Sequence, residues 1–269
     1  MLAAAVAMVH RTGLTVSLDH ISFEDVIRDA DVARSAVYRR WPYKDLFFSD
    51  LVKELAEEAI PPALLDDEYE LIRRVVAEHL DWLDTPELRA SLVSELFRQA
   101  ALLDFEAFCG SPEWRTYFAL HATFLSLADG ELREEVQAAL ARSEQARLAR
   151  IVKGWQQLAR LLGYRVRPEA GVTLDTVVTL IDATMHGIVI TALATPAIAT
   201  QRITAAPFGA AVQEWSLPAL GAASIAAAFF EPDPAIQWDS ERIAHVRQAL
   251  TDVTAAEVRP GLGHPQPRP

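Results

Sequence analysis

One segment carries most of the structural information in this chain: residues 22–51 read SFEDVIRDADVARSAVYRRWPYKDLFFSDL. Ser22 is a favoured helix N-cap. Apolar residues follow it at helical spacing and would bury one face of a helix: Phe23, Val26, Ile27 and Ala30. Asp31 tolerates the left-handed backbone of a tight turn, and a second helix over Ala33–Arg40 has to end before Pro42. The segment predicts a helix, a tight turn and a second helix.

The basic charge of this region is concentrated on the second helix. The chain carries a net charge of −12, and residues 1–60, with seven Lys/Arg and ten Asp/Glu, sum to −3. Residues 32–44 nevertheless contain four basic residues and no acid. We expect Val37 to face the core and Trp41 to anchor the junction. The outward residues are candidate DNA contacts, since arginine can pair with guanine and a helix start favours phosphate: Arg34, Ser35, Ala36, Tyr38, Arg39, Arg40 and Lys44.

Residues 30–46, ADVARSAVYRRWPYKDL, resemble the turn, recognition helix, aromatic–proline junction and lysine-led fourth helix of the tetracycline-repressor (TetR) family. The helix predicted over Leu2–Arg11, followed by Gly13, resembles the opening of that family. The specific similarity covers about the first fifth of the chain. The resemblance implies that Tyr38 and Lys44 contact phosphates and that Arg34, Ser35, Ala36 and Arg39 contact bases or backbone.

Three residues depart from the family pattern. Asp31 replaces the usual turn glycine, and Tyr43 replaces a small polar cap. Ala33 replaces a polar N-cap, which weakens the helix start by about 1 kcal/mol. No basic arm precedes the first helix. These departures leave one alternative open, a helical interaction protein of the same fold that has lost DNA binding.

Helical periodicity recurs through the rest of the chain and strand signals are scarce, so the predicted fold class is all-α. Pro61-Pro62 would separate a DNA-binding domain (1–60, including the fourth helix) from a larger helical domain (61–258) and a mobile tail (259–269). Six helices follow the apolar face predicted around 72–83: about 86–109, 112–125, 131–162, 174–194, 218–230 and 240–258. Gly163 would stop the longest of them. The proline-rich region 195–238 is otherwise hard to assign.

The resemblance also implies a ligand cavity in the larger domain, and such pockets are apolar with a few polar groups. The candidate ligand-binding residues are Trp82, Phe97, Phe105, Trp114, Phe118, His121, Trp155 and His186. Core packing is the alternative interpretation for most of these aromatics, and for His79 and His121. Asp175, Asp182 and His186 share one stripe of a helix, which fits a surface strip or a dimer interface better than a pocket wall. The basic run from Arg142 to Arg167, which includes Arg147, is interpreted as the solvated face of the long helix, with a second nucleic-acid site as the alternative.

The expected function is a ligand-responsive transcriptional regulator, a repressor released from its operator by a small apolar or amphipathic effector. A single recognition helix contacts too few bases, so a homodimer on palindromic double-stranded DNA is expected, with helices about 34–36 Å apart. No catalytic motif, cofactor or metal site is predicted, and Cys109 is the single cysteine. An enzyme with an unrecognised site in the apolar body remains a further alternative. We expect a soluble cytoplasmic protein, because the most apolar stretch, 172–194, carries Asp175, Asp182 and His186.

Overall fold

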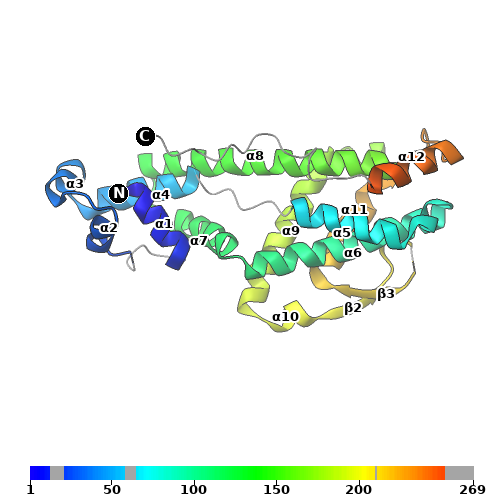
Figure 1. Ribbon diagram of the computed structural model, residues 1–269, viewed down its shortest axis with the longest axis horizontal. Coiled ribbons are helices and arrows are strands. Elements are labelled where there is room, and N and C mark those ends of the chain that lie inside the picture. Colours follow the sequence, from blue (N-terminus) through cyan, green and yellow to red (C-terminus); the bar gives the residue numbers. More distant parts are fainter. Residues whose placement is uncertain (13–20, 58–64, 210, 252–269) are drawn as a thin grey trace. The chain divides into compact units, whose positions relative to one another are not determined.

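The computed structural model describes residues 1–12, 21–57, 65–209 and 211–251 (Figure 1). These residues are mostly helical, which confirms the all-α prediction. The chain divides into two compact units, each built from several segments. The first comprises Met1–Ala63, Phe105–Trp155 and Val189–Ala194, and the second comprises Leu64–Asp104, Gln156–Ile188 and Thr195–Pro269. The predicted break at Pro61-Pro62, the helical residues beyond 251 and the tail lie outside the described residues.

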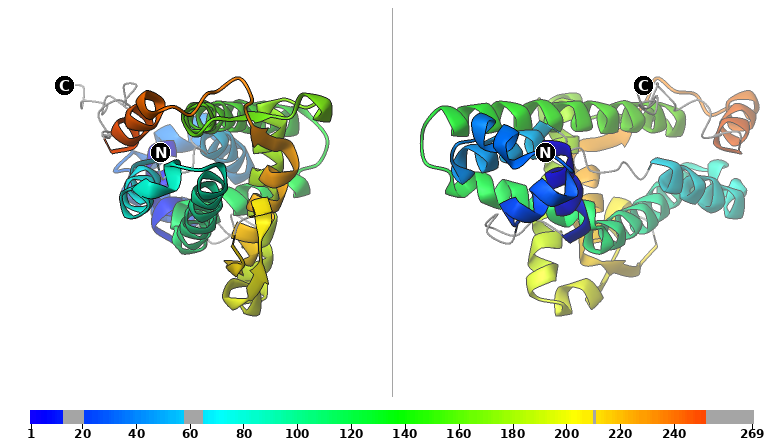
Figure 2. Two further views of the ribbon diagram at one scale, coloured as in Figure 1. Left: turned by 90° about the vertical axis from the view of Figure 1, so that its right-hand side faces the viewer. Right: turned by 60° about the vertical axis from the view of Figure 1, so that its left-hand side comes forward.

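The first unit begins with four helices: α1 (Leu2–Thr12), α2 (Phe23–Asp29), α3 (Arg34–Arg40) and α4 (Lys44–Glu57). It also contains α7 (Pro112–Ser126) and most of α8 (Glu131–Leu162). Helix α1 packs against α2, α4 and α7 (Figure 2). Their shared core includes Val9, Val26, Phe47 and Leu51, none of which exposes its side chain. Burying a side chain such as Phe47 contributes about 2–3 kcal/mol.

The second unit contains α5 (Leu65–Glu78), the 3-10 helix η2 (Leu80–Leu83) and most of α6 (Pro86–Gly110). Beyond α8 it holds, in chain order, β1 (Tyr164–Val166), η3 (Pro168–Ala170), most of α9 (Leu174–Ala194), α10 (Ala197–Thr200), β2 (Arg202–Ala205), η4 (Pro207–Gly209), β3 (Gln213–Ser216), α11 (Leu217–Phe229), β4 (Phe230–Pro232) and α12 (Ser240–Thr251). Helix α12 packs on α5. The core of this unit fully buries Val75 and Val76 of α5, Leu92 of α6 and Val246 of α12.

Local capping explains why several helices begin and end where the sequence predicts. The Ser22 hydroxyl accepts a hydrogen bond from the Asp25 amide at 3.3 Å. Ser111 caps α7 in the same way, through the Trp114 amide at 3.2 Å. Gly163 ends α8 with φ +71°, the left-handed conformation that glycine adopts at helix ends. The predicted bounds of the long helices over 131–162 and 174–194 are confirmed.

Three short strands, β2, β3 and β4, occupy part of the region 195–238 that was hard to assign, and β1 precedes it. β1 pairs antiparallel with β4, with Arg165 opposite Glu231. β2 pairs antiparallel with β3, with Ile203 opposite Trp215, and α11 packs on this second pair (Figure 1). Each strand has only three or four residues, too few to produce a periodicity that sequence inspection detects.

Two predicted helix faces need correction. The apolar face predicted around 72–83 does not belong to one continuous helix, because α5 ends at Glu78 and η2 follows. In the helix predicted over 112–125, helical spacing would put Leu125 on one apolar face with Trp114, Tyr117 and Phe118, but Leu125 is 76% exposed. Leu120 is buried instead, at 1% exposure. Neighbouring residues of a helix differ by about 100° in direction, so several overlapping sets of apolar residues could each form the buried face. Tertiary packing decides which set is buried.

Helix α9 is the one described helix that is long and apolar enough to cross a membrane by length and composition. Core helices of soluble proteins meet the same criteria, and α9 buries Val177, Val178 and Val189 in the protein. The expectation of a soluble protein is compatible with this finding.

Candidate nucleic-acid interface

Six of the seven predicted DNA-contacting residues lie on α3, which follows α2 after a tight turn, and Lys44 begins α4. Asp31 supplies the turn with φ +48°, a conformation that aspartate tolerates. Val26 and Ile27 bury the inner face of α2, and Val37, at 3% exposure, is the buried residue of α3. A helix of seven residues that rests on one buried side chain presents nearly all its other side chains to solvent.

Trp41 fixes the junction between α3 and α4. Its indole is 6% exposed and packs edge-on against Phe47, with ring centroids 5.3 Å apart. The indole Nε1 donates a hydrogen bond to Asp50 Oδ2 at 2.9 Å. Because aromatic pairing and the hydrogen bond act together, the ring holds α3 at a defined angle to α4. The predicted core role of Trp41 is confirmed.

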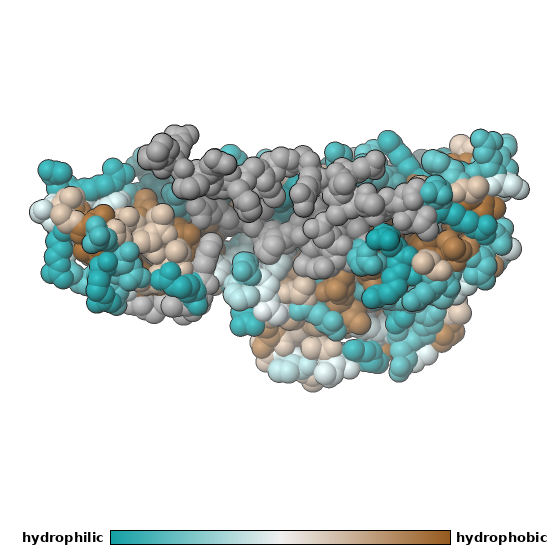
Figure 3. All heavy atoms as spheres, viewed as in Figure 1, coloured by the Kyte–Doolittle hydropathy of each residue, from teal (hydrophilic) through white to brown (hydrophobic). Residues whose placement is uncertain are grey.

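All seven candidate DNA contacts are exposed: Arg34, Ser35, Ala36, Tyr38, Arg39, Arg40 and Lys44. The Arg40 guanidinium lies 5.0 Å from the centre of the Trp41 ring, and the Lys44 ammonium lies 5.0 Å from that of Phe48. Arg39 forms no ion pair with another described residue. The surface over α2 and α3 is largely hydrophilic, with apolar patches among the polar groups (Figure 3).

Two exposed apolar residues beside the basic segment were not among the candidates. Tyr43, which directly precedes α4, is 73% exposed, and Leu46, in the first turn of α4, is 49% exposed. The amino-acid sequence does not predict that these two large side chains are exposed to solvent. An exposed Tyr–Leu pair flanking Lys44 adds apolar contact area to the basic face.

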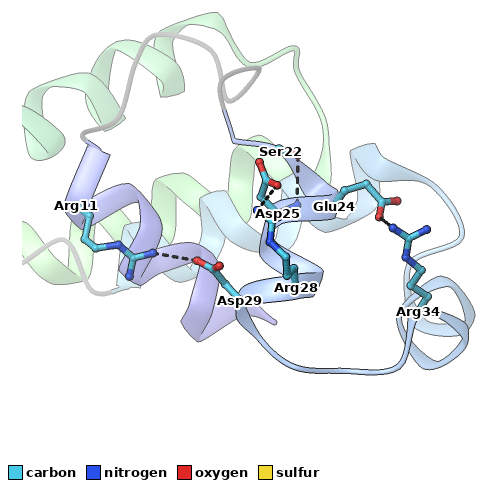
Figure 4. Close-up of polar contacts among 7 residues, drawn as sticks. All are labelled: Arg11, Ser22, Glu24, Asp25, Arg28, Asp29 and Arg34. Atoms are coloured by element: carbon cyan, nitrogen blue, oxygen red, sulfur yellow. Dashed lines mark hydrogen bonds and ion pairs between the residues drawn. The ribbon is translucent and has the colours of Figure 1, made fainter.

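Glu24, at the start of α2, contacts two of the candidate residues and was also missed by sequence reasoning. Its carboxylate forms an ion pair with Arg34 (Figure 4). Its Oε1 also accepts a hydrogen bond from the Tyr38 hydroxyl at 3.0 Å. That hydrogen bond, with smaller effects of burial and of the Glu24 charge, raises the pKa of Tyr38 above its ordinary value. Acidic residues are common in the first turn of any helix, so no sequence signal distinguishes Glu24 from an ordinary helix-start acid.

Five candidate ligand-binding residues lie in the first unit: Phe105, Trp114, Phe118, His121 and Trp155. Trp114, 2% exposed, stacks on Phe108 with ring centroids 3.8 Å apart. Phe118 packs against Trp114 at 5.7 Å, while His121 Nδ1 lies 3.0 Å from the Tyr117 carbonyl oxygen. The structure thus brings Trp114 and Phe118 into one aromatic cluster.

Arg147 lies beside this cluster and corrects the interpretation of the basic run as a solvated face. Its side chain is 6% exposed and forms two hydrogen bonds with the Glu144 carboxylate, at 3.1 and 2.7 Å. The Tyr117 hydroxyl donates to the same carboxylate at 2.8 Å. The guanidinium is 5.8 Å from the Trp114 ring centre. Periodicity misplaced Arg147 because α7 covers that side of α8.

The other three candidates, Trp82, Phe97 and His186, belong to the second unit. Trp82 stacks on His79 at 3.9 Å, and Phe97 lies 5.5 Å from Phe208. On α9, His186 Nε2 lies 3.7 Å from Asp182 Oδ1, and both side chains are mostly buried. The surface-strip interpretation therefore describes only Asp175, which is exposed. The eight candidates are thus divided between two units.

Comparisons of this chain with protein-family models, with curated proteins and with solved structures each find no match.

Proposed function

We propose that this chain is a ligand-responsive transcriptional regulator that binds a palindromic DNA operator as a homodimer, with α2 and α3 forming a helix-turn-helix and α3 acting as the recognition helix. The observation that carries the proposal is the exposed basic face of α3, supported by the buried side chains of Val37 and Trp41. A short helix held in this way can enter a major groove without disturbing the core.

The side chains on this face have distinct roles in the proposal. Arg34 and Arg39 have planar guanidinium groups that can pair with guanine edges or with phosphates. Lys44 starts α4, where its charge and the free backbone N–H groups of the helix start both attract phosphate. Tyr43 and Leu46 supply apolar contact beside them. The similarity of residues 30–46 to the TetR family supports these assignments.

The effector and the dimer complete the proposal. A small molecule bound in the helical body would favour a different spacing of the two recognition helices, and by linkage it would weaken operator binding. Helix α4 can transmit such a change, since it carries the α3 junction at one end and packs against α1 and α7. The aromatic cluster of Trp114 and Phe118 is the candidate effector contact within the first unit.

The deciding experiment selects the purified protein against random duplex DNA and then measures the affinity of the enriched duplex at several salt concentrations. We expect a palindrome whose affinity falls steeply with salt, because phosphate contacts release counterions. Arg39→Ala should weaken binding about 5- to 100-fold, the effect of losing one bidentate base contact. The charge-matched control is Arg73→Ala on α5, an exposed arginine paired with Glu70, which should leave affinity within twofold.

Two results would contradict the proposal. One is the absence of any enriched duplex for a protein that circular dichroism and sedimentation show to be a folded helical dimer. This result supports the alternative of an interaction protein that has lost DNA binding. The other is an equal effect of Arg39→Ala and Arg73→Ala, which would mean that the binding responds to overall charge and not to α3.

A further inference from the structure

Helix α2 carries three acidic residues, and only one of them contacts the proposed recognition helix. Asp25 forms an ion pair with Arg28 of the same helix at 2.6 Å, and Asp29 forms one with Arg11 of α1 at 3.1 Å. Glu24 instead points toward Arg34 of α3 (Figure 4). The difference follows from position, since Glu24 lies at the start of α2 and Asp29 at its end.

Both oxygens of the Glu24 carboxylate are used. Oε2 pairs with the Arg34 guanidinium, and Oε1 accepts the hydrogen bond from Tyr38. Arg34 and Tyr38 are four residues apart and therefore lie on one face of α3. The Tyr38 ring is also held edge-on by Phe23, at a centroid distance of 5.7 Å. A single carboxylate thus engages two of the donors assigned to DNA contact.

A carboxylate and a phosphate offer these donors the same chemistry, an anionic oxygen that accepts charge-assisted hydrogen bonds. We propose that Glu24 is an internal competitor of the DNA phosphates, which occupies Arg34 and Tyr38 in the free protein and is displaced when they bind the duplex. This inference rests on the proposed function. Glu24 thereby lowers the affinity of the protein for all duplexes, so that only sites supplying further base contacts are bound tightly.

The solvent exposure of the Arg34–Glu24 ion pair limits how much Glu24 can lower the affinity for DNA. The side chains of Arg34 and Glu24 are 70% and 45% exposed. Exposed ion pairs are weak, so DNA can displace Glu24 readily. Its negative charge also repels nearby phosphates, an effect that salt screens over about 10 Å at 0.1 M. Glu24 therefore lowers the affinity for DNA but does not prevent binding.

The test measures binding of a labelled random-sequence 30-bp duplex, and of any selected duplex, to wild type and Glu24→Gln at several salt concentrations. We expect Glu24→Gln to bind about 3- to 10-fold more tightly at low salt, with the gain shrinking as salt rises. The matched control is Asp29→Asn, which removes the same charge from the same helix but has Arg11 as its partner. It should bind within twofold of wild type.

A second comparison separates competition from general charge. In an Arg34→Ala/Tyr38→Phe background the gain from Glu24→Gln should disappear, because the donors that Glu24 occupies are gone. A gain that persists there, or an equal gain in Asp29→Asn, overturns the inference. If the inference fails but Arg39→Ala still weakens DNA binding relative to wild type, the proposed function stands.

The pairing can also be tested without DNA. Ring-carbon NMR of Tyr38 should show a lower pKa in Glu24→Gln than in wild type, because the charged acceptor that raises the pKa is replaced by a neutral amide oxygen. An unchanged Tyr38 pKa overturns the inference whatever the DNA result. Failure of folded wild type and Glu24→Gln alike to bind any duplex overturns both this inference and the proposed function.

Discussion

Gly163 illustrates how much one residue determines in this chain. Its backbone ends α8 in the left-handed region, and a Cβ built there would lie 2.9 Å from Cζ2 of Trp238. The Trp238 ring is confined, since the guanidinium of Arg89 lies 4.3 Å from its centre and that of Arg242 lies 5.6 Å from it. Both the backbone conformation and the close approach therefore require glycine.

Gly163→Ala should lower the free energy of unfolding by about 2–4 kcal/mol, through left-handed strain and the contact with Trp238. Denaturant unfolding measures this change. The control is Gly154→Ala within α8, where an added Cβ meets nothing within 4 Å. That variant should be unchanged or more stable by about 0.5–1 kcal/mol. Equal effects of the two substitutions would contradict the argument.

At the scale of the element, α3 is the least supported of the helices around the proposed interface. It has seven residues, and its N-cap, Ala33, is extended (φ −65°, ψ 125°) and makes no side-chain hydrogen bond. Ser22, by contrast, caps α2 through its hydroxyl. A short helix with one buried residue opens locally at a low free energy, and its ends then decide its stability.

Ala33→Ser should therefore stabilise α3 by about 0.5–1 kcal/mol, because the serine hydroxyl can accept from a free amide at the helix start. Hydrogen exchange of the α3 amides measures the gain. Ala36→Ser introduces the same side chain inside the exposed helix, where serine is a poorer helix former than alanine. It should bring no protection. If it slows exchange as much as Ala33→Ser, capping is not the cause.

At the scale of the whole molecule, stability toward acid depends on a buried carboxylate of α6. Glu95 is 6% exposed and accepts hydrogen bonds from Arg98 Nε at 2.8 Å and from Gln99 Nε2 at 2.5 Å. Burial alone raises its pKa, but these donors together outweigh burial and hold the pKa of Glu95 below its ordinary value. A carboxyl whose pKa is lower in the folded state stabilises the fold above the unfolded pKa, and this contribution is lost as pH falls through the folded pKa.

Glu95→Gln should lower the free energy of unfolding by about 2 kcal/mol at neutral pH, the scale of hydrogen bonds to a charged group. The difference from wild type should shrink below about pH 4, because there the unfolded wild-type carboxyl is protonated, and the folded one follows only as the pH falls through its lower pKa. Urea unfolding at both pH values measures it. Glu106→Gln, exposed on the same helix, should change stability by no more than about 0.5 kcal/mol. If the free energy of unfolding differs between wild type and Glu95→Gln by the same amount at both pH values, this account is contradicted.

Features of the candidate interface that depend on nearby residues were predictable from the sequence, and contacts between distant residues were not. The cap at Ser22, the turn at Asp31 and the burial of Val37 and Trp41 were all predicted, as was the exposure of the seven candidate DNA contacts. Each depends on a side chain and the backbone within a few residues of it, or on the spacing of apolar residues along one helix. The role of Glu24 was not predictable, because its partner Tyr38 lies 14 residues away.

The sequence by itself determined that the described chain is mostly helical, where its long helices begin and end, and which face of α3 meets water. Tertiary structure alone decided that Arg147 is buried, that Leu125 is exposed, and that β1 pairs with β4 across 66 residues at Arg165 and Glu231. The physical reason is range. Helix formation and capping act over three or four residues, whereas burial, ion pairs and strand pairing depend on which distant segments the packed core brings together.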